Sequence, residues 1–183
     1  MMRIKEYRKA ESLEEAYELN QKKSNRIIAG GLWMKMGDRN LMTAIDLSGL
    51  GLDQIEETES EFVIGCMVTL RDFEVHPGLN AYTKGAAKES VCHIVGVQFR
   101  NCATVGGSIY GRFGFSDVLT LFAALDCYVE LYHGGNVPIR DFIHMDYDND
   151  ILVAVHIKKT PLKVTYLSQR NTATDFPVLA MAI

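Results

Sequence analysis

The sequence lacks the compact motifs that usually mark a metal site or a phosphate site. It has no C-x-x-C pair, no H-E-x-x-H motif and no G-x-x-x-x-G-K-[ST] loop. Its five histidines are scattered, so we expect no metal site. The four cysteines lie far apart, which gives little support to disulfides, an iron–sulfur cluster or a zinc site. We expect free, mostly buried thiols in a reducing cytoplasm, at Cys66, Cys92, Cys102 and Cys127.

The sequence also lacks a basic block and a long apolar run. Its net charge is −4 over 183 residues, which argues against a nucleic acid as partner. The longest interior apolar stretch, at residues 118–125, is far shorter than the roughly 20 residues that a membrane helix needs. The charged opening segment, MMRIKEYRKAESLEEAYELNQKK, shows no signal peptide. We therefore expect a cytoplasmic protein without membrane contact, folded as one globular unit or as two small subdomains.

The apolar pattern predicts mixed helices and strands, which is typical of an α/β fold. Helices are expected over residues 11–23, 70–76, 79–91 and 116–127, with caps at Ser12, Thr69 and Ser116 and a capping box completed by Glu15. Strands are expected over residues 25–31, 41–49 and 61–69, and a strand–turn–strand unit over 128–139. Residues 148–159 and 162–170 look like successive strands of one antiparallel sheet. The acidic stretch at residues 52–61 indicates a boundary between two subdomains.

Two segments each carry a Gly-Gly pair behind small or β-branched residues. They are IIAGGLWMKMG at residues 27–37 and ATVGGSIYG at residues 103–111. Glycine permits positive φ and a close approach of another group, and successive exposed N–H groups form a concave anion site. Either segment alone is also compatible with an ordinary turn. The residues themselves therefore indicate anion-binding loops, such as those that hold a nucleotide, but no G-x-G-x-x-G fingerprint.

The second segment says more when it is read with its flanks. The stretch VQFRNCATVGGSIYGRFGFSDVLTLFAAL resembles the FAD-binding domain of the molybdenum hydroxylases, which include xanthine dehydrogenase and carbon monoxide dehydrogenase. The family pattern is roughly Q-x-R-N-x-A-[ST]-[VI]-G-G-N-[IL], followed by S-P-x-[SA]-D and an apolar helix. The first segment is similar to the family's A-G-G-[ST]-[DN]-L. Residues 148–157, DNDILVAVHI, resemble its D-E-I-L strand.

This resemblance implies a two-subdomain α/β (α+β) fold of the vanillyl-alcohol oxidase type. A small parallel-stranded subdomain and a larger antiparallel sheet with helices would hold FAD between them. We expect an N-terminal subdomain at residues 1–55, a second at 56–160, and the start of a C-terminal flavoprotein domain at 161–183. The last residues, DFPVLAMAI, are apolar, whereas natural domains more often end in polar, loosely held residues. We therefore expect the chain to be a fragment or to lack a following domain.

The resemblance also implies which residues contact FAD. One side of the diphosphate would be lined by Ala29, Gly30, Gly31, Leu32, Trp33 and Met34. The other side would be lined by Thr104, Gly106, Gly107 and Ser108, with Gly111 close by. The resemblance also implies that Asp117 accepts hydrogen bonds from the adenosine end, and a carboxylate suits this position since charged hydrogen bonds are strong. Leu152 would pack near the flavin ring.

Some positions depart from the family pattern. Leu32 and Trp33 stand where a hydroxyl and an acid or amide are usual, which leaves backbone N–H groups as the main phosphate contacts. Trp33 is also able to stack on the cofactor or cover it. Ser108 replaces an asparagine. Phe113 and Gly114 replace the S-P of the second motif.

By resemblance, the chain is the FAD-binding electron-transfer part of a molybdenum hydroxylase. A large molybdenum-cofactor subunit would oxidise the substrate, and a 2Fe-2S subunit would pass electrons through FAD to NAD⁺ or another acceptor. No catalytic base or nucleophile is visible in this chain, and none is required. The alternative is a non-catalytic assembly module that has kept the fold and lost FAD. A self-contained flavin oxidase ranks last, because no covalent attachment motif is present.

Overall fold

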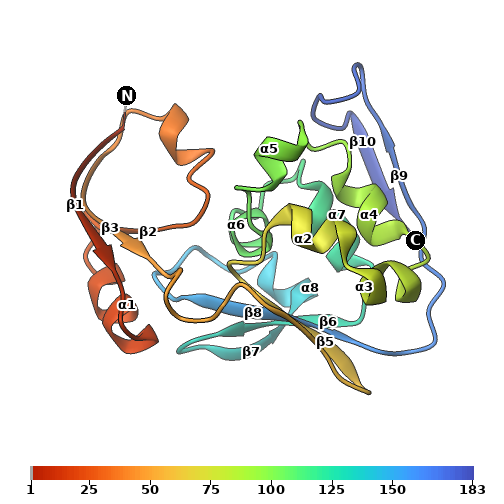
Figure 1. The fold of residues 1–183 in the computed structure, drawn as a ribbon, viewed down its shortest axis with the longest axis horizontal. Helices are drawn as coiled ribbons and strands as arrows, with labels where there is room; N and C mark the ends of the chain where they lie inside the picture. Colours follow the sequence, from red (N-terminus) through yellow and green to blue (C-terminus); the bar gives the residue numbers. More distant parts are fainter. Residues whose placement is uncertain (1) are drawn as a thin grey trace.

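The computed structural model describes residues 2–183, so the first residue of the expected 1–55 subdomain lies outside the described part. A three-stranded parallel sheet of order β1-β3-β2 forms the N-terminal part (Figure 1). Its elements are β1 (Arg3–Lys9), α1 (Leu13–Asn20), β2 (Arg26–Ile28), the 3₁₀ helix η1 (Met34–Met36) and β3 (Asn40–Asp46). The sequence pattern missed β1, since all of its residues are exposed and RIKEYRK shows no apolar alternation. This edge strand is positioned by backbone pairing with β3.

A five-stranded antiparallel sheet of order β4-β5-β8-β6-β7 forms the second part. Its strands are β4 (Ile55–Glu57), β5 (Glu61–Gly65), β6 (Cys127–Leu131), β7 (Gly135–Pro138) and β8 (Leu152–Lys158). The helices of this part are α2 (Leu70–Val75), α3 (Pro77–Tyr82), α4 (Ala86–Val91), α5 (Val97–Arg100), α6 (Val105–Tyr110), α7 (Asp117–Ala123) and α8 (Ile139–Phe142). Figure 1 shows α2 to α7 gathered on one side of the sheet. The expected fold class, with a small parallel sheet and a larger antiparallel one, is confirmed.

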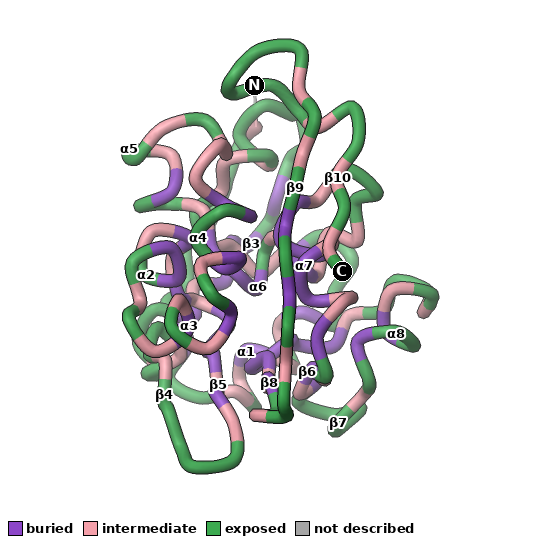
Figure 2. The backbone as a smooth tube through the Cα atoms, turned by 90° about the vertical axis from the view of Figure 1, so that its right-hand side faces the viewer, coloured by how far each residue is buried: buried purple, intermediate pink, exposed green. Residues whose placement is uncertain are grey.

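The core lies between this sheet and its helices. Alternate residues of β5, among them Phe62 and Ile64, are fully buried, as are Phe73 of α2 and Phe122 of α7. The rings of Phe73 and Phe122 have centroids 5.7 Å apart. Figure 2 shows the buried stretches running through β5, β8 and α7, while the connections at the periphery are exposed. The helices that carry the second glycine segment and Asp117 are therefore seated on a packed core.

Two predicted elements are wrong in their pairing or extent. The expected helix at residues 79–91 is two helices, α3 and α4, because Lys84 and Gly85 have φ of 51° and 88° and break the helix. Residues 162–170 do not continue the large sheet. Instead, β9 (Tyr166–Gln169) pairs antiparallel with β10 (Leu179–Ala182) in a separate two-stranded sheet. Figure 1 shows this C-terminal hairpin beside α4 and α7.

The three predicted helix caps are confirmed. Ser12, Thr69 and Ser116 each accept a hydrogen bond from the backbone N–H three residues on, at 3.0–3.2 Å. The carboxylate of Glu15 returns to the N–H of Glu11, at 2.8 Å, instead of that of Ser12. These caps were predictable because the interaction is local in sequence.

The proposed domain boundaries stay a proposal. The first strand of the large sheet, β4, begins at Ile55, and β9 begins the separate sheet at Tyr166. Both positions are close to the expected boundaries at residues 55 and 160. The change of sheet at each boundary supports the division.

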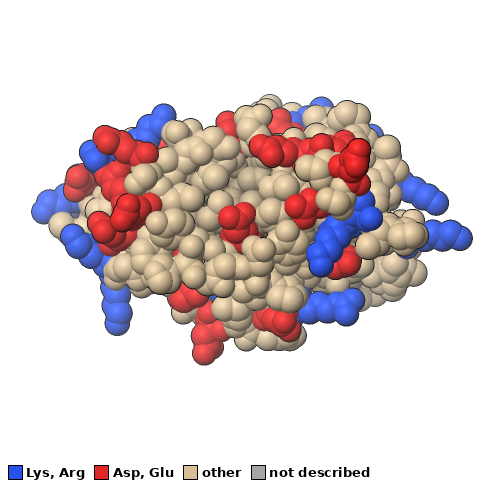
Figure 3. Space-filling view, turned by 90° about the horizontal axis from the view of Figure 1, so that it is seen from below, with Lys and Arg blue, Asp and Glu red and all other residues tan. Residues whose placement is uncertain are grey.

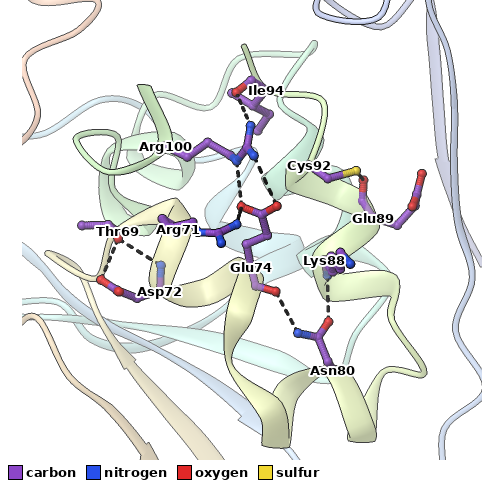
Figure 4. Close-up of polar contacts among 10 residues, drawn as sticks. All are labelled: Thr69, Arg71, Asp72, Glu74, Asn80, Lys88, Glu89, Cys92, Ile94 and Arg100. Carbon is purple, nitrogen blue, oxygen red and sulfur yellow. Dashed lines mark hydrogen bonds and ion pairs between the residues drawn. The ribbon is translucent and has the colours of Figure 1, made fainter. Parts of the chain in front are cut away.

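A buried ion pair ties α5 to α2 (Figure 4). The Nε atom of Arg100 donates to Glu74 at 2.8 Å, its Nη1 atom donates to the carbonyl of Ile94 at 3.2 Å, and Arg71 also donates to Glu74 at 2.9 Å. Burial alone would raise the pKa of Glu74, but the hydrogen bonds from Arg100 and Arg71 outweigh it and lower that pKa. Arg100, at the matched motif position, is therefore a structural residue that fixes the start of the second glycine segment.

Charged side chains of both signs occur on the face of the molecule seen from below (Figure 3). On the face seen in Figure 3, the Lys and Arg side chains lie mainly toward the ends and are interspersed with acidic groups. No helix within residues 2–183 is long and apolar enough to cross a membrane.

The four thiols differ strongly in accessibility, which predicts their order of reaction. Burial raises the pKa of Cys66 and of Cys127 to about 12, and burial followed by Glu89 raises the pKa of the partly buried Cys92. Because the thiolate is the reactive form, a chromogenic thiol reagent at neutral pH should label exposed Cys102 first and Cys92 more slowly. Cys66 and Cys127 should react only after denaturation.

The Cys102→Ser variant is the control and should lose the fast phase alone. Equal rates for all four thiols in the native protein would contradict this burial pattern.

Candidate functional site

The first glycine segment follows β2 and leads into η1. Gly31 has φ of +65°, a conformation that other residues rarely adopt. Within residues 2–183, no acceptor takes the backbone N–H of Gly31, Leu32, Trp33 or Met34. The carbonyl of Gly31 accepts from the N–H of Lys35 at 2.9 Å and closes the turn. Four successive donors are thus left without an internal partner, which is what an anion-binding concavity requires.

The second glycine segment differs from the expected open loop. Residues 105–110 form α6, and Thr104 caps it by accepting from the N–H of Gly107 at 3.1 Å. The N–H groups of Val105 and Gly106 donate to the carbonyls of Val68 and Cys66 at 2.9 and 3.0 Å. The interpretation of residues 103–111 as a run of exposed amides was therefore wrong, since the turn after β5 already takes these donors.

The two glycines of each pair have different environments. A Cβ atom at position 30 would lie 2.0 Å from the carbonyl oxygen of Cys102, and one at 106 would lie 2.6 Å from Cβ of Cys66. A Cβ atom at position 31 would meet nothing within 4 Å, and one at 107 would meet only Oγ1 of Thr104, at 3.1 Å. The first glycine of each pair therefore permits close packing. The second glycine of each pair faces space that is open at Gly31 and bordered only by Oγ1 of Thr104 at Gly107.

The hydroxyl groups near α6 form a short chain of hydrogen bonds. Ser108 donates to the carbonyl of Thr104 at 2.9 Å, and Ser116 donates to the carbonyl of Ser108 at 3.2 Å. The hydroxyl of Thr104 accepts from Gly107 and keeps its own proton for another acceptor. The carbonyl of Gly111 is taken by the hydroxyl of Tyr147. Thr104 is thus the side-chain donor that this segment offers.

Asp117 is buried, with 5% of its surface exposed, and its carboxylate is already held by the C-terminal hairpin. Its Oδ1 atom accepts from the hydroxyl of Tyr166 and from Nη2 of Arg170. Burial, followed by the hydrogen bond to Asp117, raises the pKa of Tyr166, which keeps that hydroxyl a donor. The Oδ2 atom has no hydrogen-bond partner among the described residues. Any adenosine contact of Asp117 would use that second oxygen.

Leu152 begins β8, pairs with Leu131 and is 5% exposed. It belongs to the hydrophobic core. Its contact with a flavin ring stays a prediction, as do the other FAD contacts assigned from the sequence.

Four exposed rings, which we name the aromatic cluster, lie beside the glycine segments. Trp33 comes from the first segment, Phe113 and Phe115 follow α6, and Phe176 comes from the hairpin connecting β9 to β10. Trp33 stacks on Phe176 with centroids 5.7 Å apart, and Phe113 stacks on Phe115 at 5.2 Å. Trp33 lies 5.8 Å from both Phe113 and Phe115. Large exposed aromatic groups that gather in this way usually mark a binding surface.

The sequence patterns did not predict several contacts of this region, because the residues that make them are far apart in the chain. Tyr166 and Arg170 lie 49 and 53 positions after Asp117. Arg112 has φ of 46°, and its guanidinium lies 4.0 Å from the ring centroid of Phe142 without a hydrogen-bond partner among the described residues. The sequence contained no local signal for these contacts.

The chain belongs to the FAD-binding domains of molybdopterin dehydrogenases, because the sequence model of that family matches residues 2–159. The resemblance inferred from the two glycine segments is confirmed, and FAD is the cofactor of the family.

Solved structures agree with this assignment. Quinoline 2-oxidoreductase from Pseudomonas putida 86 matches with a TM-score of 0.87 and 22% identity, over 97% of this chain and 67% of that one. A cyanide-inactivated Cu,Mo-CO dehydrogenase matches with a TM-score of 0.86 and 23% identity, over 100% and 69%. These two identities support the fold alone. Reconstituted CO dehydrogenase from Oligotropha carboxidovorans matches with a TM-score of 0.83 and 25% identity, over 96% and 67%. A comparison with curated protein sequences finds no match.

The two glycine segments fit a diphosphate, and most of the available donors belong to the first segment. The first segment offers four N–H groups that have no partner among residues 2–183, and Gly31 keeps that surface free of a side chain. The second segment offers the open face at Gly107 and the hydroxyl of Thr104. The donors are neutral, as is common where backbone amides hold a phosphate.

The different roles of Gly106 and Gly107 predict different effects of one methyl group. Gly106→Ala should lower the free energy of unfolding by about 1–3 kcal/mol, because Cβ would overlap the backbone of Cys66. Gly107→Ala should change it by less than about 1 kcal/mol, since only the Oγ1 atom of Thr104 is near and alanine favours the helix. Urea denaturation of both variants tests this difference. Equal losses would contradict the assignment of the two glycines.

Proposed function

We propose that this chain is the FAD-carrying electron-transfer component of a molybdenum hydroxylase. The proposal rests on one observation. Four successive backbone donors at residues 31–34 have no partner within the described part of the chain, at the point where the two glycine segments of an FAD-binding family meet. Bound FAD would supply the redox chemistry, and the protein would position it.

The proposed contacts follow from the environment of each residue. The N–H groups of residues 31–34 would donate to the diphosphate, and Thr104 would add its hydroxyl beside the open face at Gly107. Asp117 would offer its second carboxylate oxygen to the adenosine end. Gly30 and Gly106 would act indirectly, by letting the two segments pack closely enough.

The partners and the acceptor belong to the same proposal. The family is that of the molybdopterin dehydrogenases, one of the structural relatives is a Cu,Mo-CO dehydrogenase, and this chain spans 67–69% of the three matched chains described above. We propose a molybdenum-cofactor subunit that oxidises the substrate and a 2Fe-2S subunit that delivers electrons to FAD, with NAD⁺ or another acceptor receiving them in the cytoplasm. The chain itself would hold and orient FAD without a catalytic base of its own.

Two observations favour a second candidate, an assembly module that has lost FAD. The first amides of α6 are taken by the turn after β5, so the second segment contributes few free donors. The aromatic cluster also stacks on itself beside the glycine segments. In that case, the rings would close the cofactor site.

Binding of FAD tests the proposal directly, because Trp33 is the single tryptophan of the chain and lies in the first glycine segment. Adding FAD to the purified chain should quench the tryptophan fluorescence of Trp33 in a saturable way. The flavin absorbance should stay with the protein through gel filtration. Gly107→Val should abolish both signals, because its side chain would fill the open face. Circular dichroism checks that this variant remains folded.

Gly96→Val is the matched control. A Cβ atom there would meet only the end of Gln98, at 3.7 Å, so FAD binding should persist. If FAD binds Gly107→Val as tightly as the wild type, Gly107 does not lie beside the diphosphate. A wild-type chain that refuses FAD would favour the assembly module.

The aromatic cluster gives a second test that separates the two candidates. If a ring of FAD stacks on these side chains, Phe176→Ala should weaken FAD binding by about 1–3 kcal/mol, roughly 5- to 150-fold. If the cluster closes the site instead, the same change should strengthen binding. Titration followed by flavin fluorescence measures the sign. Val178→Ala is the control, since this exposed residue of the same hairpin lies outside the cluster.

A further inference from the structure

Three side chains with metal-binding atoms meet at the end of α4, away from the glycine segments. Glu89, Cys92 and His93 each place one ligand atom within 4.8 Å of the other two. They occupy positions i, i+3 and i+4, which share one face of a helical turn. Figure 4 shows the sulfur of Cys92 beside the backbone carbonyl of Glu89, one turn earlier in the helix. The sequence expectation of no metal site had rested on the absence of common motifs, and E-x-x-C-H is not one of them.

The spacing of these atoms suits one tetrahedral ion. Zinc bonds of about 2.0–2.3 Å place neighbouring ligand atoms roughly 3.3–3.8 Å apart. The Nε2 atom of His93 lies 3.7 Å from Oε1 of Glu89, which is too long for a hydrogen bond but within that range. The sulfur of Cys92 makes only a weak contact, at 3.5 Å, with the carbonyl of Glu89. Small rotations of side chains would therefore bring all three atoms to one ion.

The site has room for a fourth ligand. Glu89 and His93 line a surface hollow of about 300 Å³ together with residues 168–173 of the hairpin. Ser168, Asn171 and Thr172 supply polar groups on the opposite wall. The hollow can therefore hold an ion with a water molecule in the fourth position, as in zinc sites with three protein ligands.

The chemistry of the ligand set selects the type of ion. Thiolate and imidazole favour zinc and similar transition metals, whereas Mg²⁺ and Ca²⁺ prefer oxygen ligands throughout. Arg170 also lines the hollow, but its guanidinium pairs with Asp117 and donates to the carbonyl of Asp175. Its charge is therefore largely compensated.

We propose that Glu89, Cys92 and His93 bind one zinc-type divalent cation, whose open position faces the hairpin at residues 168–173. The proposed ion site shares no ligand residue with the proposed FAD contacts. It would lie between α4 and the hairpin that also holds Asp117.

Cobalt provides a spectroscopic probe of the proposed site. Titration of the metal-free full chain with Co²⁺ should give a saturable thiolate-to-metal absorption band, with one ion per chain, and Zn²⁺ should displace it. Cys92→Ser should lose the band. His93→Ala should bind Co²⁺ at least about tenfold more weakly. Removing a metal ligand should lower the affinity at least as much as removing a residue that only hydrogen-bonds to a ligand.

The exposed Cys102 supplies the matched control, since Cys102→Ser should keep the band. Protection of wild-type Cys92 from alkylation by Zn²⁺, located by peptide mapping, gives a readout that needs no variant. The absence of a saturable band would overturn the proposal. So would a band that survives in Cys92→Ser, or Cys92 alkylation that Zn²⁺ leaves unchanged.

Discussion

The close approach of backbone to backbone at Gly30 and Gly106 is the constraint on which the site depends. Gly30 lies against the carbonyl of Cys102, and Gly106 lies against Cys66, at distances that leave no room for a side chain. The contact at Gly30 joins the first glycine segment to Cys102, the residue just before the second glycine segment. The other seats α6 on the turn after β5. Because both contacts involve backbone, neighbouring side chains cannot move aside to relieve a substitution.

This constraint separates two functions that a Gly-Gly pair can have. In both pairs the first glycine serves packing, while the second, Gly31 or Gly107, leaves its outer face open. The pairs nevertheless offer different donors. In the first segment, the N–H groups of residues 31–34 have no acceptor among residues 2–183, whereas the first amides of α6 donate to the carbonyls of Val68 and Cys66. The backbone donors that would bind a phosphate in our proposal are therefore concentrated in the first segment, whose short motif departs from the family pattern at Leu32 and Trp33.

Local interactions were predictable from the sequence, and distant ones were not. The caps at Ser12, Thr69 and Ser116 follow from residues three positions apart. Edge strand β1 has no apolar alternation, and nothing in residues 162–170 shows that β9 pairs with β10 and not with the large sheet. The glycine segments were recognised by their motif, but the helical state of residues 105–110 depends on the capping and packing around Cys66. The hydrogen bonds from Tyr166 and Arg170 to Asp117 join residues 49 and 53 positions apart, so no local sequence pattern could predict them.

The C-terminal hairpin connects these parts, and the strengths of its contacts differ. The pair between Arg170 and Asp117 is buried, with side-chain exposures of 7% and 6%. Removing one partner of such a pair typically costs about 3–5 kcal/mol. The contact between Trp33 and Phe176 is exposed, and aromatic pairs contribute only about 0.5–1.5 kcal/mol beyond their area.

Tyr166 and Arg170 therefore anchor the hairpin firmly to α7, and Arg170 also donates to the carbonyl of Asp175 in the connection. The ring of Phe176, in contrast, is held beside the first glycine segment by weaker stacking contacts. A planar ring of a bound dinucleotide offers the same kind of stacking contact as Trp33 does. Exchanging one stack for the other would cost little free energy and would leave the anchor intact. The aromatic cluster thus remains compatible with FAD binding, even though its rings contact one another in this structure.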